Sequence, residues 1–206
     1  MRIRQHVNPL RADFLQIKIE PLNLAPGKPV EVELGSAEAY FLMERAESDP
    51  TRHYVGVEIR RELVAEANAL CVSKGLDHVR SVFANISLDL PRLFAPGSVS
   101  RFFINFPDPW WKQRQRKRRV VGEDLIDQLL PLLTPDGEVH VATDIFDIAL
   151  DAMAVLEREN PRHFRNLRQP WSFAPTSFFA ARSRRERHCE EEGIRIWRLA
   201  YQRRSL

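Results

Sequence analysis

The sequence predicts a doubly wound α/β domain, in which helices cover both faces of a mostly parallel sheet. Two observations carry this prediction. Short runs rich in β-branched residues alternate along the chain with longer amphipathic segments of helical composition. Most of the short runs are also continuously apolar, as strands buried on both faces are. Sheets of this class bind ligands at the carboxyl ends of their strands, near the point where the strand order switches.

The predicted elements follow one another with short connections. The predicted strands are 29–35, 53–59, 78–85, 99–106, 138–144 and, in the C-terminal tail, 193–204. The predicted helices are 36–49, 60–75, 123–137 and 145–159. Gly75, with Lys74 in the last turn before it, marks the end of the second helix. Pro131 is expected to kink the third helix or to end it early.

Length and composition indicate a single domain preceded by an arm. The chain has 206 residues, of which 44% are apolar, enough for a core without disulfides. Residues 1–28 are Pro-rich and irregular and are predicted to form an N-terminal arm, and 29–206 the domain. Cys71 and Cys189 have no metal-ligand spacing and indicate a reducing setting. No apolar run approaches a membrane span and the start lacks a signal-peptide core, so we expect a cytoplasmic protein. No metal is expected, and the sequence leaves a monomer and a homodimer equally open.

Basic residues are segregated along the chain. The net charge is only +3, although the sequence pI is about 9.1. Six of the eight residues in 112–119 are basic, and a second basic cluster occupies 182–187. Segregated positive charge indicates an anionic partner, and nucleic acid is the first candidate. The second cluster either extends the same surface or forms a mobile loop.

The ends of the first two predicted strands indicate a nucleoside site. Gly35 ends the first strand and Glu58 the second, and an acid at that place accepts hydrogen bonds from ribose hydroxyls. Glu38 would put a carboxylate where a dinucleotide needs a phosphate site, which argues against NAD or FAD. S-adenosylmethionine has no phosphate and carries a cationic sulfonium. An acidic pocket formed by Glu33, Glu58 and Asp108 suits it.

The stretch "PDPWW" follows the fourth predicted strand. Pro107 and Pro109 restrict the backbone on both sides of Asp108, so the acid belongs to a stiff loop at the mouth of the sheet. Such an acid is a candidate for substrate recognition, and the alternative is a surface turn under an apolar lid of tryptophans. The basic run directly after the tryptophans is suited to phosphate contact, and the aromatic rings to stacking on an exposed RNA base.

The block "FFINFPDPWWKQRQRKRRVV" strongly resembles the signature of bacterial tRNA (guanine-N7-)-methyltransferases. "RIRQHVNPL", "VELG", "YVGVEI", "GEVHVATD" and "PTSFF" resemble further segments of that family, so the resemblance covers nearly the whole chain. It implies a Rossmann-like class I S-adenosylmethionine-dependent methyltransferase fold. It also implies methyl transfer to N7 of a guanine in the variable loop of tRNA, at the conventional position 46.

The resemblance assigns roles by matching positions. Glu33, Gly35, Glu58 and Asn85 would contact S-adenosylmethionine, and Asp108 would be the key active-site acid. Lys112, Asp144 and Thr176 would bind the guanosine region together with Asp108. The residues that would hold tRNA phosphates are Arg114, Arg116, Lys117, Arg118 and Arg119.

Four positions depart from the family pattern. Ala37 and Ala39 replace two glycines of G-x-G-x-G, Asn85 replaces an aspartate, and Phe179 replaces the glutamate of T-x-[FY]-E. If positions 37 and 39 need a positive φ, each alanine costs about 1–2 kcal/mol. Two alternatives therefore stay open: a tRNA-binding relative that has lost strong cofactor binding, and a different S-adenosylmethionine-dependent enzyme that acts on a small acidic substrate.

The implied chemistry needs few catalytic groups. Guanine N7 carries an in-plane lone pair and no proton, so no general base is needed. The purine gains positive charge as it is methylated, and a fixed carboxylate both positions it and stabilises that charge. Asp108 is the predicted carboxylate.

Overall fold

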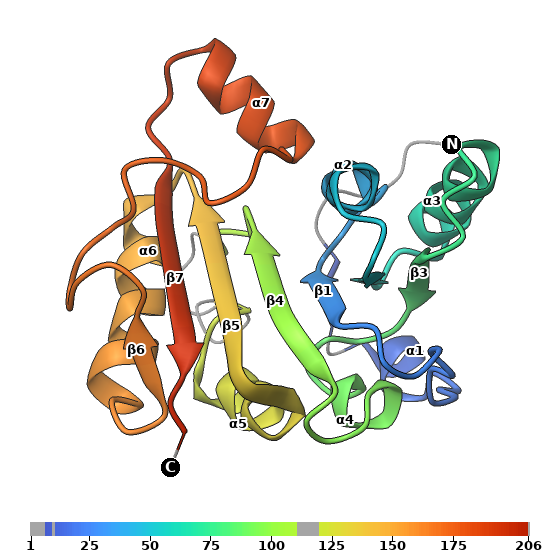
Figure 1. Ribbon diagram of the computed structural model, residues 1–206, viewed down its shortest axis with the longest axis horizontal. Helices are drawn as coiled ribbons and strands as arrows, with labels where there is room; N and C mark the ends of the chain where they lie inside the picture. The colour runs from blue at the N-terminus through green and yellow to red at the C-terminus, as the bar shows by residue number, and fades with distance from the viewer. Residues whose placement is uncertain (1–6, 10, 111–119, 206) are drawn as a thin grey trace.

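The computed structural model describes residues 7–9, 11–110 and 120–205, and these form one open sheet with helices on both faces (Figure 1). The sheet has seven strands in the order β3-β2-β1-β4-β5-β7-β6. All neighbouring strands from β3 to β5 are parallel, and β7 runs antiparallel to both of its neighbours. The doubly wound, mostly parallel sheet predicted from the sequence is confirmed.

Each predicted strand is present. The strands are β1 (Val30–Leu34), β2 (His53–Glu58), β3 (Val79–Phe83), β4 (Val99–Asn105), β5 (Leu133–Thr143), β6 (Phe164–Asn166) and β7 (Trp197–Arg203). β1 lies between β2 and β4, so the chain moves outward in one direction through β3 and then returns to the other side of β1. The switch point of the strand order therefore lies between β1 and β4.

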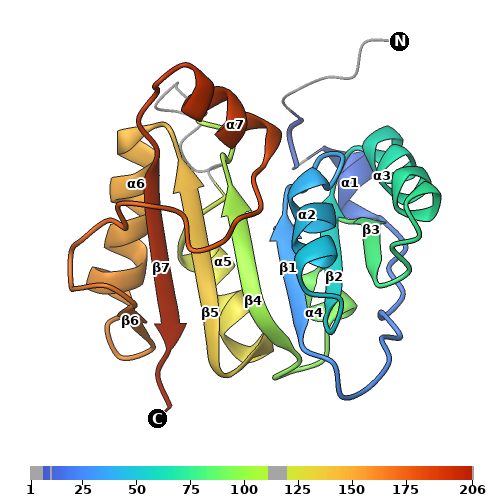
Figure 2. The ribbon, with the colours of Figure 1, turned by 45° about the horizontal axis from the view of Figure 1, so that its top comes forward.

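The helices divide between the two faces. They are α1 (Ala12–Leu15), α2 (Tyr40–Ser48), α3 (Arg61–Ser73), α4 (Leu90–Leu93), α5 (Glu123–Leu132), α6 (Phe146–Met153), which continues into a π-helical segment (Ala154–Glu159), and α7 (Arg184–Glu191). Buried side chains of α2 and α3 pack in one core cluster, and those of α4, α5 and α6 in the other. Figure 2 shows α2 in front of the sheet and α4 and α5 behind it.

Two predicted helices have different ends. The helix expected over 36–49 begins at Tyr40, because residues 36–39 form a turn. The helix expected over 123–137 ends at Leu132, one residue after Pro131, as expected from the proline. Residues 12–15, within the predicted arm, form the short helix α1, and Ile19, Leu22 and Leu24 pack against the core.

β1 separates an apolar face from a charged one. Val30, Val32 and Leu34 enter the larger core cluster, whereas Glu31 and Glu33 point to the side of α2. Glu31 is fully buried and pairs with Arg45 at 2.9 Å and Arg101 at 2.7 Å.

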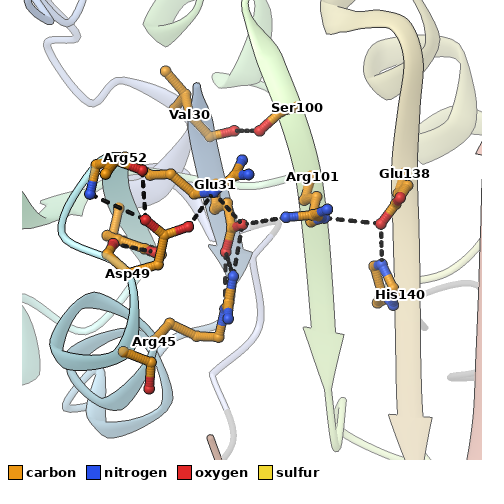
Figure 3. Close-up of polar contacts among 12 residues, drawn as sticks. Val30, Glu31, Arg45, Asp49, Arg52, Ser100, Arg101, Glu138 and His140 are labelled. Carbon is orange, nitrogen blue, oxygen red and sulfur yellow. Dashed lines mark hydrogen bonds and ion pairs between the residues drawn. The ribbon is translucent and has the colours of Figure 1, made fainter. Parts of the chain in front are cut away.

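The Glu31 network continues across the sheet (Figure 3). Arg101 also contacts Glu138 at 2.8 Å, and Glu138 contacts His140 at 2.8 Å. Burial lowers the pKa of His140, so its ring is neutral at pH 7. Phe179 covers this layer, with its ring 4.3 Å from the guanidinium carbon of Arg45. The segment that carries Phe179 is thus anchored on the charged face of the sheet.

Candidate functional site

A cavity of about 320 Å³ lies at the carboxyl ends of β1 to β4, at the switch point of the sheet. It brings together all five of the predicted site residues that lie at these ends: Glu33, Gly35, Glu58, Asn85 and Asp108. These residues come from four different strands or the loops that follow them. The sheet topology, rather than sequence proximity, assembles the site.

The turn after β1 has a backbone suited to glycine at three alternate positions. Gly35 has φ +79°, Ala37 +47° and Ala39 +58°, all in the left-handed region. The two alanines therefore carry a conformational cost of about 1–2 kcal/mol each. The turn keeps its hydrogen bonds nevertheless, since the Ala37 N–H donates to Glu58 Oε2 at 2.9 Å. The turn thus adopts a left-handed backbone at both positions where alanine stands in place of glycine.

Glu33 is a buried carboxylate with one oxygen unsatisfied. Its Oε1 accepts a hydrogen bond from Asn105 Nδ2 at 2.9 Å, while its Oε2 has no partner among the described residues. The side chain lines the cavity and is only 4% exposed. Burial, with a smaller repulsion from Glu58, raises the pKa of Glu33 to about 8. A cationic ligand group beside Oε2 would satisfy this oxygen and favour the charged form.

Glu58 has every acceptor position occupied. Its Oε1 accepts hydrogen bonds from the backbone N–H and the Nε of Arg60, at 3.0 and 2.8 Å. Its Oε2 accepts from Arg60 Nη2 at 2.8 Å and from the Ala37 N–H. A carboxylate offers about four lone-pair sites, so the Arg60 side chain uses two of them. Arg60 itself lines the cavity, and it is a site residue that the sequence reasoning missed.

Asp108 lies in a loop with an unusual backbone. Phe106 and Trp110, on either side of the Pro-Asp-Pro stretch, have φ values of +49° and +43°. Asp108 is half-buried and lines the cavity together with Pro107 and Trp110. Its charge also reaches Arg60: the carboxylate of Glu58 and, more weakly, that of Asp108 raise the pKa of the Arg60 guanidinium. The rigid acid predicted from the sequence thus faces the same cavity as Glu33 and Glu58.

Thr176 and Asp144 are not among the residues that line this cavity. Thr176 is exposed. Asp144, at the end of β5, accepts a hydrogen bond from Arg185 at 2.5 Å, and Arg185 does line the cavity.

Ser183, immediately before α7, lines the cavity with Arg184 and Arg185. Its hydroxyl accepts a hydrogen bond from the Glu186 N–H at 3.2 Å and caps the helix. Ser183 and Glu186 have the spacing of the family's T-x-[FY]-E element, which the sequence predicts at Thr176. The S-x-x-E helix-start pattern was the signal that could have found it.

The basic cluster 182–187 is folded rather than a mobile loop, and the chain's own acids pair with it. Arg184 contacts Glu38 at 2.8 Å, and Arg187 contacts Glu44. With the Arg185–Asp144 pair, α7 is tied both to the turn after β1 and to the end of β5. The cluster therefore fixes α7 over the site.

The predicted phosphate contacts, and one predicted substrate contact, lie outside the described residues. The phosphate contacts are Arg114, Arg116, Lys117, Arg118 and Arg119, and the substrate contact is Lys112. Within the described ranges, no group of His, Cys, Asp and Glu side chains is arranged to hold a metal ion. No helix of the described part is both long and apolar enough to span a membrane.

Comparisons with known proteins show the family to which the chain belongs. The family described as "Putative methyltransferase" matches residues 27–199. A tRNA (guanine-N(7)-)-methyltransferase of Synechococcus sp. (strain JA-3-3Ab) is 38% identical, over 98% of this chain and 86% of the relative. The enzyme of the same name from Thermosynechococcus vestitus is 31% identical, over 98% of this chain and 95% of the relative.

Solved structures show the same fold at low identity. An rRNA methylase from Streptococcus thermophilus superposes with a TM-score of 0.56 at 8% identity, covering 86% of this chain and 88% of that one. A protein from Streptococcus mutans, described as a putative methyltransferase in complex with SAH, superposes with a TM-score of 0.57 at 5% identity, covering 85% and 89%. The predicted class I methyltransferase fold is confirmed.

Proposed function

Because the chain belongs to the family of tRNA (guanine-N7-)-methyltransferases, we propose that it transfers a methyl group from S-adenosylmethionine to N7 of a guanine in tRNA. The observation that carries the proposal is the cavity at the switch point, which three carboxylates from three separate strand ends face. An acidic pocket without a phosphate-binding turn suits a cationic nucleoside. The relatives named above support the tRNA substrate.

The cavity residues fit the methyl donor. S-adenosylmethionine supplies a methyl group on a cationic sulfonium and also carries an ammonium. The unsatisfied oxygen of Glu33 suits one of these cationic groups, and Glu58 suits the ribose. Since β2 carries Glu58 and β4 leads to Asp108, the adenine would lie toward β3 and the transferable methyl toward Asp108.

Binding of a ribose at Glu58 requires the Arg60 side chain to move. The two hydroxyls of a ribose each need an acceptor, and Arg60 Nε and Nη2 now use one site on each Glu58 oxygen. The backbone donors of Arg60 and Ala37 remain in place when the side chain leaves. The two ribose hydroxyls would therefore replace the two side-chain donors of Arg60, Nε and Nη2. The nearby carboxylate of Asp108 offers the released guanidinium an alternative partner.

Asp108 then acts on the guanine. Its carboxylate accepts hydrogen bonds from N1–H and the exocyclic amine, which orients N7 toward the methyl donor. Its negative charge favours the purine as it becomes cationic. No group has to remove a proton, because N7 carries none. Pro107 and Pro109 keep the acid in a fixed place, so little reorganisation is needed during the reaction.

The rest of the substrate contacts follow from the same proposal. The guanine is the one in the tRNA variable loop, at position 46, and the protein works in the cytoplasm. Lys112, Asp144 and Thr176 remain predicted substrate contacts, and Ser183 is added because it lines the cavity. Phosphate contacts are assigned to the run from Arg114 to Arg119.

The experiment that tests the proposal compares Asp108→Ala with the wild type. Radiolabelled methyl transfer into bulk tRNA is measured, and the modified base is then mapped. We expect Asp108→Ala to lose nearly all transfer while tRNA binding is kept. Asp77→Ala, at an exposed loop position before β3, is the control and should keep full activity. Turnover by Asp108→Ala close to that of the wild type would refute the role of Asp108.

A tRNA-binding relative without strong cofactor binding is the second candidate. The left-handed alanines at 37 and 39 motivate this candidate, because they strain the turn that lines the cavity. Calorimetric titration with S-adenosylmethionine separates the two. A dissociation constant in the micromolar range supports the enzyme, and no measurable heat supports the binder.

A further inference from the structure

Asn85 uses its side-chain donors on the N-terminal segment of the chain. Its Nδ2 donates to the carbonyl oxygen of Pro9 at 2.9 Å and to that of Phe14 at 3.3 Å. Its Oδ1 accepts from the Ser87 N–H at 3.0 Å. An amide has two N–H donors, so both are committed to backbone carbonyls more than 70 residues away in sequence.

The loop that carries Asn85 is itself rigidly held. The Asn85 N–H donates to Asp89 Oδ2 at 2.8 Å, and Asp89 is in turn paired with Arg92. Asn85 is fully buried. The Asn85 side chain is therefore held in one place, from which it reaches the N-terminal segment.

Residues 7–9 and 11–15, which we call the N-terminal wall, meet the cavity. Val7 and Pro9 line it beside Asn85 and Ile86. The wall also contacts β3, because the Phe14 ring packs edge-on against Phe83 with the ring centroids 6.4 Å apart. Of the two carbonyls that Asn85 holds, one belongs to the lining residue Pro9 and the other to Phe14, which makes the aromatic contact.

The position of the wall in the cavity follows from the strand order. Asn85 follows β3, while Asp108 follows β4, which is three strands away. At about 4.8 Å per strand, the two ends of the cavity are roughly 14 Å apart. The wall thus stands at the end away from Asp108, and its uncharged side chains Val7 and Pro9 are suited to the flat face of a base.

We propose that the N-terminal wall closes the adenine end of the methyl-donor pocket and that Asn85 is the positioning residue that holds it there. The inference rests on the proposed function, since it takes the cavity to be the S-adenosylmethionine site. It gives Asn85 a task different from reading the adenine edge directly: both of its donors serve the wall, and the wall in turn packs against the donor molecule.

The test is Asn85→Asp, which is nearly isosteric. An aspartate keeps the acceptor for Ser87 but loses both donors and sets a carboxylate oxygen against two carbonyl oxygens. Loss of two hydrogen bonds shifts the closed-to-open ratio of the wall by about tenfold or more. We expect tryptic cleavage of the Arg11–Ala12 bond, followed by mass spectrometry, to accelerate by that factor.

The same variant is then assayed as an enzyme. We expect its dissociation constant and KM for S-adenosylmethionine to rise by about tenfold. The kcat at saturating donor and the KM for tRNA should stay close to the wild-type values. A general loss of structure would change all parameters together and would not single out the donor.

Asn68→Asp is the matched control. Asn68 also donates from Nδ2 to a backbone carbonyl, that of Ser81 at 2.9 Å, but it lies on α3 and does not line the cavity. It should change neither cleavage at Arg11 nor donor binding. Val7→Ser, which leaves Asn85 intact, is a second variant and should weaken donor binding without faster cleavage.

Each outcome decides a separate point. Unchanged cleavage in Asn85→Asp overturns the positioning role. Faster cleavage with unchanged donor affinity overturns the wall as part of the pocket. A wild-type protein that binds no S-adenosylmethionine refutes the proposed function instead, and the cleavage comparison still reports on Asn85.

Discussion

Replacing Ala37 by glycine should stabilise the protein. Ala37 has φ +47°, so its methyl group costs about 1–2 kcal/mol against a glycine in the same place. Glycine also increases the conformational entropy of the unfolded chain, which lowers the free energy of unfolding by about 0.4–1 kcal/mol. Because the Ala37 side chain is half-exposed, little packing is lost. The net gain is about 0.5–1 kcal/mol, or about 1–4 °C in Tm for a chain of this length.

Ala39→Gly provides the internal contrast. Its φ of +58° carries the same strain, but its methyl group is 1% exposed and packs in the core cluster with α2. Removing a buried methyl costs about 0.8 kcal/mol, which cancels the gain. Differential scanning calorimetry should therefore show a higher Tm for Ala37→Gly and an almost unchanged Tm for Ala39→Gly. The reasoning is refuted if Ala37→Gly lowers the Tm or if Ala39→Gly raises it more.

Two further predictions concern the carboxylates of the cavity. The pKa of Glu33 in the folded protein, about 8, lies above its ordinary value near 4.5, so the fold favours the protonated form. The free energy of unfolding therefore falls as pH rises from about 4.5 through 8. Urea unfolding at several pH values should show this fall and Glu33→Gln should flatten it, whereas the same pH dependence in both proteins would contradict it. Arg60→Ala should lower the dissociation constant for S-adenosylmethionine by about fivefold, because no guanidinium then competes for Glu58; weaker binding in calorimetry would mean that Arg60 helps to hold the donor instead.

The central strands were predictable because most of their side chains are buried on both faces of the sheet. β4 contains Phe102, Phe103 and Ile104, all of them buried, and its apolar run is plain in the sequence. β1 was predictable for a different reason, because its valines alternate with glutamates as in a strand. The partners that neutralise Glu31 appear only in the fold. The pairing of Glu31 with Arg45 and Arg101 joins segments that no sequence pattern links.

α7 was missed because it has almost no apolar stripe. Its sequence is RRERHCEE, and within it only Glu186 and Cys189 are buried. Its stability comes from ion pairs, since Glu186 contacts Arg198 of β7 at 2.7 Å. From sequence alone such a helix cannot be told from an exposed charged segment, because its stability depends on tertiary partners. The three-residue strand β6 likewise has too few residues for a pattern.

The acids of the site were predictable from their places at strand ends, but their partners were not. Glu33, Glu58 and Asp108 each follow from the rule that ligands bind where parallel strands end. Whether Glu58 has acceptor capacity left depends on Arg60, and hydrogen-bond occupancy cannot be counted from sequence. The hydroxyl at the cavity is that of Ser183 rather than Thr176, and this too depends on contacts that the sequence does not show. The segment between them packs Phe179 against Arg45, on the charged face of the sheet.

The departures from the family pattern act on the pocket in different ways. Alanine at 37 strains the turn but leaves its N–H donating to Glu58, so the turn still shapes the site. Asparagine at 85 gains two donors that an aspartate lacks, and it uses both to bring the N-terminal wall to the cavity. Alanine at 37 therefore lowers the stability of the fold, whereas asparagine at 85 helps to close the pocket. Under the proposed function, donor affinity also depends on the exchange at Glu58, where ribose hydroxyls must displace the bidentate Arg60 guanidinium. Comparing Arg60→Ala with Ala37→Gly separates these contributions, because the first acts on binding and the second on stability.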